Sequence, residues 1–205
     1  MRISKVFFPA VLAVSLLIGA TSAFASTVDF ESTALGEYSS LAFADFQIKS
    51  VAGTFVVVDQ TPGPPVSHHS IINFAGQCAG CASSHFLVTA LTPFNYFQVG
   101  GGDFNADDDP IHLRAYDSLN NLIGSDDNLI PLSTFGGLYL SVLTAGPIDH
   151  VEFWSDGAFP ESLYWDNITA ADRGLDAAVP EPTSLCTIAG GLAALAGLRK
   201  RFNRA

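Results

Sequence analysis

The hydrophobic residues of this chain fall in short runs separated by Gly, Pro, Asn, Asp and Ser. In Ile111–Ala115 apolar and polar positions alternate, and Val151-Glu152-Phe153 repeats this alternation. Such a pattern is typical of a β-strand that has one face in water. No part of the body shows a sustained 3.6-residue period. The pattern predicts strands over Thr27–Glu31, Phe43–Ser50, Thr54–Asp59, Ser70–Phe74, His85–Leu91, Phe94–Val99, Ile111–Asp117, Leu122–Ser125, Leu138–Leu143, His150–Ser155 and Leu163–Thr169.

Many short strands without helices or repeats indicate an all-β fold, a single β-sandwich of jelly-roll type over residues 26–169. The segment Asp117–Asn121 has turn chemistry and predicts a hairpin between its flanking strands. Residues 170–178 lose the pattern and are expected to form a linker.

The N-terminus has the features of an export signal. Arg2 and Lys5 precede the apolar run Val6–Ala20, and Ala23-Phe24-Ala25 is a small-x-small cleavage site. We expect a signal peptide over residues 1–25 and a mature start near Ser26. A retained transmembrane helix is the alternative.

The C-terminus, residues 179–205, consists of three pieces in a fixed order. Val179-Pro180-Glu181-Pro182 is stiff and irregular. The uncharged stretch 183–198 is predicted to form a short transmembrane helix of about 24 Å at ~1.5 Å per residue. This is less than the ~30 Å hydrocarbon core of a bilayer. Basic residues between Arg199 and Arg204 then favour a cytoplasmic end.

This order of Pro-Glu-Pro, short helix and basic end resembles the PEP-CTERM sorting signal, and Val179, Pro180, Glu181 and Pro182 carry the resemblance. It implies processing by exosortase, a membrane-embedded cysteine protease, in a Gram-negative-type bacterium that exports polysaccharide. The implied location is a membrane-anchored intermediate, then the cell surface or extracellular matrix. An ordinary tail anchor is the alternative.

Charge narrows the choice of partners. Between Asp29 and Glu181 the chain has all twenty acidic residues but three basic ones, Lys49, Arg114 and Arg173, which is a net charge of about −17. This excludes nucleic acid and anionic lipid as partners of a basic face. Divalent cations and neutral partners such as extracellular polysaccharide fit better.

Two motifs could bind metal or form a disulfide. Cys78-Ala79-Gly80-Cys81 predicts a structural disulfide in an exported chain, while zinc would need further ligands such as His85 with His68 or His69. Asp103, Asn105 and Asp107 have the spacing of the first ligands of a calcium loop, and Asp109 adds a fourth oxygen donor after the flexible lead-in Gly100–Gly102. Asp108 and Arg114 break the EF-hand pattern, so the stretch is either a different calcium site or a solvated acidic loop.

Three aromatic residues, Trp154, Tyr164 and Trp165, are candidates for a sugar-stacking platform if exposed, and for the core if buried. Leu163–Thr169 and Val28–Glu31 resemble the last and first strands of PEP-CTERM proteins with galactose-binding-like or lectin-like sandwich domains.

No serine lies in a Gly-x-Ser-x-Gly elbow, and the acids gather on turns rather than standing singly on strands. We therefore expect an exported, non-catalytic protein of the envelope or matrix that binds glycans. A purely structural matrix protein and a small polysaccharide-acting hydrolase are the alternatives. No cofactor other than calcium is expected.

Overall fold

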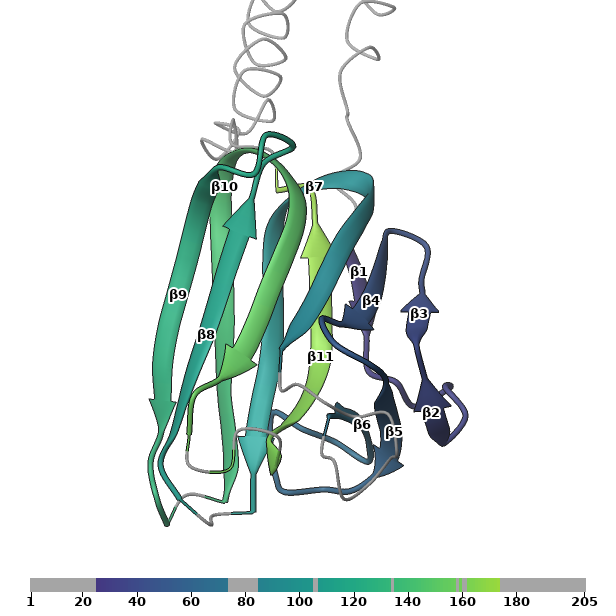
Figure 1. Ribbon diagram of the computed structural model, residues 1–205, viewed down its shortest axis with the longest axis vertical. Helices are drawn as coiled ribbons and strands as arrows, with labels where there is room; N and C mark the ends of the chain where they lie inside the picture. The colour runs from purple at the N-terminus through teal and green to yellow at the C-terminus, as the bar shows by residue number, and fades with distance from the viewer. Residues whose placement is uncertain are drawn as a thin grey trace, which may run out of the picture.

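The computed structural model describes residues 25–73, 85–104, 107–133, 135–157, 159 and 162–173. Throughout these residues the chain is built from antiparallel β-strands, and no α-helix occurs among them. Figure 1 shows the strands arranged in two layers, as the alternating sequence pattern predicts for a sandwich.

The first layer holds the strands that follow one another as β9-β8-β10-β7-β4-β3. Here β10 uses its second half and β7 its first half. The bounds are β3 Ser40–Ala42, β4 Phe46–Ser50, β7 Phe86–Asp103, β8 Asp109–Tyr116, β9 Leu122–Ile130 and β10 Gly136–Ser155.

The second layer follows the order β10-β7-β11-β6-β5-β2, with β1 also paired to β11. It uses the first half of β10 and the second half of β7. The remaining bounds are β1 Ala25–Val28, β2 Gly36–Tyr38, β5 Phe55–Asp59, β6 His69–Ile72 and β11 Tyr164–Ala171.

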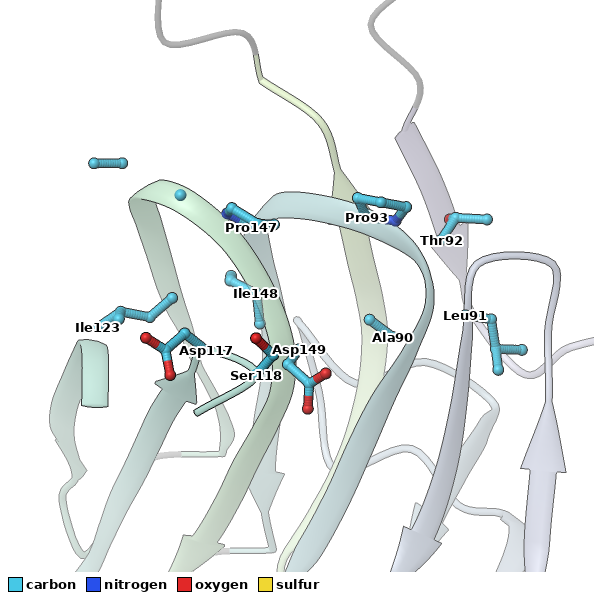
Figure 2. Close-up of a pocket in the computed structure, with 12 residues that line it drawn as sticks. Ala90, Leu91, Thr92, Pro93, Asp117, Ser118, Ile123, Pro147, Ile148 and Asp149 are labelled. Carbon is cyan, nitrogen blue, oxygen red and sulfur yellow. The ribbon is translucent and has the colours of Figure 1, made fainter. Parts of the chain in front are cut away.

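β7 and β10 are each continuous, and they join the two layers. The predictions of separate strands His85–Leu91 and Phe94–Val99, and of Leu138–Leu143 and His150–Ser155, were wrong in this respect. Pro93 and Pro147 lie where the paired strands bend from one layer into the other (Figure 2). The register shifts between Leu143 and His150, which marks the bulge at this bend.

The glycine run Gly100–Gly102 is also not the flexible lead-in that the sequence suggested. These residues are buried in β7 and are paired with both β10 and β11. A Cβ atom on Gly101 would lie 2.9 Å from Cζ3 of Trp165, so glycine is needed here for close packing rather than for flexibility.

The core lies between the layers and is rich in phenylalanine. Phe153 of the first layer packs against Phe97 and Trp165 of the second, with ring centroids 6.4 Å and 4.8 Å away. The hairpin predicted at Asp117–Asn121 is confirmed between β8 and β9. The Asp117 carboxylate accepts hydrogen bonds from the amides of Leu119 and Asn121, and Asn120 takes a left-handed φ of 63°.

Candidate metal centre

Three carboxylates meet at the end of the sandwich drawn lowest in Figure 1. Asp103 ends β7, Asp107 lies in the loop that follows, and Asp109 begins β8. One oxygen from each lies within 4.8 Å of the others. The structure thus brings together three of the four predicted calcium ligands, while the fourth, Asn105, lies outside the described residues.

Asp109 is the unusual member of this cluster because its side chain is fully buried, with an exposed fraction of 0%. Neither of its carboxylate oxygens has a hydrogen-bond donor among the described residues. Burial first, and then the charges of Asp103 and Asp107, raise the pKa of Asp109 to about 7.

Gly157, which follows β10, covers the cluster from the side. A Cβ atom at this position would lie 2.7 Å from Oδ1 of Asp109 and 3.2 Å from the Asp108 carbonyl oxygen. Glycine therefore allows the backbone after β10 to approach the buried carboxylate closely, where any side chain would clash. The Asp108 carbonyl oxygen and the Ser155 hydroxyl also border this position, at 3.2 Å and 3.4 Å from it.

The adjoining loops are hydrogen-bonded to Asp107 of the cluster and to its neighbour Asp108. Asp107 accepts a hydrogen bond of 3.3 Å from the Phe159 amide, and Asp108 accepts one of 2.7 Å from the Leu132 amide. The loops that follow β7, β9 and β10 therefore meet at this cluster.

The donor set suits calcium. Calcium binds carboxylate, carbonyl and water oxygens at 2.3–2.6 Å, so two oxygens on one ion can be no more than about 5 Å apart. The 4.8 Å limit on the three Asp oxygens meets this condition. A buried carboxylate that lacks a donor is also strongly unfavourable unless a cation neutralises it.

The predicted aromatic platform was wrong for two of its three residues. Trp165 is 1% exposed and points into the core, and Tyr164 is 9% exposed and packs with Val56, Val66 and Ile72. The reason is that β11 lies inside the second layer, with both faces covered. Burial, and then the charge of Asp103, raises the pKa of Tyr164.

Trp154 lies instead on the outer face of the first layer, where it is half-buried between neighbouring side chains. The rings of His85 and His112 lie 4.7 Å and 5.1 Å from it, and the guanidinium of Arg114 lies 5.5 Å from its centroid. These neighbours were not predicted as a group. The alternation in β8 places His112, Arg114 and Tyr116 on one face, so the sequence pattern could have predicted that these three residues lie together.

A pocket of about 610 Å³ opens at the other end, where β7 and β10 bend (Figure 2). Its apolar lining includes Leu91, Ile123 and Ile148, and it carries the acids Asp117 and Asp149. Asp117 is engaged in its own turn, and its hydrogen bonds to Asn121, with that to Leu119, hold the pKa of its carboxyl below the usual range.

Several predictions fall outside the described residues. These are the signal peptide, the Cys78–Cys81 pair, the motif Val179–Pro182 and the helix 183–198. Where the structure does describe the chain, it shows no helix with the length and apolar character to cross a membrane.

No known family model matches the chain, and no curated protein does either. Among solved structures, the chain is similar to a DUF4465 family protein from Bacteroides caccae, with 15% identity, 73% of this chain and 100% of that chain covered, and a TM-score of 0.42. It is also similar to a cleaved adhesin domain of Lys-gingipain from Porphyromonas gingivalis, with 11% identity, coverage of 71% and 97%, and a TM-score of 0.42.

A family 29 carbohydrate-binding module gives 10% identity, coverage of 73% of this chain and 88% of that one, and a TM-score of 0.25. Similarities at this level assign neither a family nor a ligand to this chain.

Proposed function

We propose that this protein is an exported, non-catalytic β-sandwich that binds calcium through Asp103, Asp107 and Asp109. The observation that carries the proposal is the fully buried Asp109 carboxylate, which has no hydrogen-bond donor among the described residues and lies beside two other acids. Calcium would neutralise the three carboxylates. It would also fix the three loops that meet there.

The same geometry argues against hydrolysis at this cluster. A glycosidase needs two carboxyl groups that face a substrate across a cleft. Asp109 is fully buried and Asp103 is 4% exposed, so a sugar chain cannot reach either group. This burial supports ion binding, rather than hydrolysis, as the role that we propose for these acids.

Calcium should raise the melting temperature of the metal-free protein by about 5–10 °C. At a hundredfold excess over its dissociation constant, a ligand of the folded state stabilises it by about 2.7 kcal/mol, at about 2–4 °C per kcal/mol for a domain of this size. The measurement is a thermal melt of dialysed protein with and without millimolar calcium. Magnesium should give a smaller shift, since it demands shorter bonds and a regular octahedron.

Two variants separate this site from general cation binding to an acidic protein. Asp109→Asn should abolish the calcium shift and raise the melting temperature of the metal-free protein, because it removes a buried unpaired charge. Asp59→Asn removes the same charge from an exposed side chain and should leave the shift unchanged. No shift in the parent protein, or an undiminished shift in Asp109→Asn, would refute the site.

Gly157→Ala offers a test that keeps all three acids. Its methyl group would stand 2.7 Å from Oδ1 of Asp109, in the space that we assign to the ion and its ligands. We expect calcium affinity to fall at least tenfold, measured by competition with a fluorescent calcium indicator. Equal affinity in the variant would place the ion away from Gly157.

The export part of the proposal rests on the two ends of the sequence. In a host with an exosortase we expect the mature protein to lack the signal peptide and the basic tail Arg199–Arg204. Intact-mass analysis of the protein recovered from the cell surface or matrix measures this directly. A mass that retains the tail would show that residues 179–205 are a plain membrane anchor.

A further inference from the structure

The solvent-facing side chains of β8 and β10 form three directly opposed pairs. Trp154 lies opposite His112, Glu152 opposite Arg114, and His150 opposite Tyr116. We call these six residues the outer strip. At ~3.3 Å per residue the first and last pairs are about 13 Å apart, with the charged pair between them.

Aromatic groups stand at both ends of the outer strip. The His112 ring lies 5.1 Å from Trp154, and the Tyr116 and His150 rings are stacked at 4.8 Å with 13° between their planes. Both ends therefore offer apolar ring surface beside polar ring atoms. This combination suits a sugar, which has an apolar C–H face and a rim of hydroxyl groups.

The polar groups of the strip are held in place by carboxylates around it. Arg114 binds Asp127 through both of its terminal nitrogens, at 2.8 Å and 3.1 Å. His112 lies 2.6 Å from Asp127 through Nδ1 and 3.3 Å from Asp156 through Nε2. Little side-chain freedom remains to be lost when a partner binds, and such preorganisation favours affinity.

Two further carboxylates pair with histidines along the strip. Glu152 lies 3.3 Å from Nε2 of His85, and Asp149 lies 3.0 Å from Nδ1 of His150. The permanent positive charge of Arg114 thus stands among four carboxylates, those of Asp127, Asp149, Glu152 and Asp156. This excess of negative charge repels a polyanion, so a partner would be recognised through hydrogen bonds and contacts with the aromatic rings.

We propose that the outer strip binds an extended, neutral polysaccharide, with sugar units at the Trp154 and Tyr116 ends and hydrogen bonds to Arg114 and Glu152 between them. The inference goes beyond the calcium site, and it rests on the proposed export only for where the partner is met. It assigns the binding to the outer face of the first layer. The buried Tyr164 and Trp165 take no part.

The strip also leads toward the pocket of Figure 2. Asp117 directly follows Tyr116, and Asp149 directly precedes His150, so the stacked pair adjoins the pocket lining. A polysaccharide that runs along the strip would have its next unit at this pocket.

The test is native affinity electrophoresis of the purified full-length protein, in mild detergent and calcium-containing buffer. The gels contain soluble β-glucan, mannan or xylan, or alginate as the polyanion. We expect retardation by at least one of the neutral polymers and none by alginate. Trp154→Ala and Tyr116→Ala should each weaken binding about tenfold, so the test holds even if one variant does not fold.

Tyr139→Ala is the matched control, since this exposed tyrosine lies on the half of β10 that belongs to the other layer. It should bind as the parent does. A parent protein that no neutral polymer retards, or that alginate retards more strongly, would overturn the proposal. So would folded Trp154→Ala and Tyr116→Ala variants that keep parental affinity, or a loss in Tyr139→Ala as large as theirs. A negative result here leaves the melting test of the calcium site untouched.

Discussion

Lowering the pH from 7 to 5 should weaken calcium binding about fiftyfold, because a proton and the ion compete for Asp109. Burial, together with the charges of Asp103 and Asp107, raises the pKa of Asp109 to about 7. Well below that pH each bound ion must displace a proton, so the slope should approach a tenfold fall in affinity per pH unit. Above pH 8 it should no longer change.

The measurement is calorimetric titration with calcium in two buffers that differ in their heat of ionisation. At pH 6 the difference in observed heat should correspond to nearly one proton released per ion, and at pH 8.5 to almost none. Calcium should be removed beforehand by dialysis, since a chelator left in the cell also takes up protons in this range. An affinity that is constant between pH 5 and 7 would show that Asp109 is not a ligand.

Metal-free protein should show the opposite dependence in its stability. The pKa of Asp109 in the folded protein is raised to about 7 from an ordinary value of 3.8, so protonation favours the folded state. This stabilising contribution is complete below pH 3.8 and is lost as the pH rises through 7. The melting shift caused by calcium should therefore be small at pH 5 and reach its full size above pH 7.

Much of the sandwich follows from the alternation of apolar and polar residues. Residues Ile111, Leu113 and Ala115 are buried in β8, and His112 and Arg114 face outward, as their order predicts. The hairpin at Asp117 was readable because its turn is stabilised by hydrogen bonds within five consecutive residues. Local chemistry of this kind is present in the sequence itself.

The continuity of β7 and β10 could not be read in the same way. A proline in a strand usually marks an edge or an end. At Pro93 and Pro147 the missing amide is tolerated because the strands bend there between layers (Figure 2), and this bend is a property of the whole sandwich. The predicted strand ends at Leu91 and Leu143 rested on local sequence alone, and tertiary pairing continues both strands beyond them.

The candidate metal site could be predicted in part, because three of its ligands lie close together in the sequence. The alternate spacing of Asp103, Asp107 and Asp109 is visible in the sequence and identified the cluster. The close contact of Asp109 with Gly157 was not readable, because Gly157 is remote in the sequence and is brought there by the pairing of β8 with β10. Trp154 is two residues after Glu152 in β10, so the alternation of buried and partly exposed residues places both on the outer face. Around Tyr164 and Trp165, consecutive residues of β11 are buried, so no alternation predicts which way these side chains point.

The contact between Gly101 and Trp165 joins β7 to β11 in the core. The two residues are direct partners across the strands, and Trp165 also lies 4.8 Å from the ring of Phe153. An alanine methyl at position 101 would approach Cζ3 and Cε3 of Trp165 to 2.9 Å and 3.1 Å. The buried ring cannot withdraw without disturbing its packing on Phe153.

Trp165→Ala should lower the free energy of unfolding by about 3–5 kcal/mol, the usual cost of removing a buried tryptophan side chain. Gly101→Ala should lower it by about 1–3 kcal/mol through overpacking. In the double variant the cavity left by the indole accommodates the new methyl group, so the second cost should disappear.

Urea unfolding in calcium-saturated buffer gives the four free energies of this cycle. Gly146→Ala is the control, since no heavy atom lies within 4 Å of its Cβ position, and it should change stability by about 0.5 kcal/mol or less. If Gly101→Ala costs as much without the indole as with it, the glycine is required by the backbone of β7 and not by the ring of Trp165.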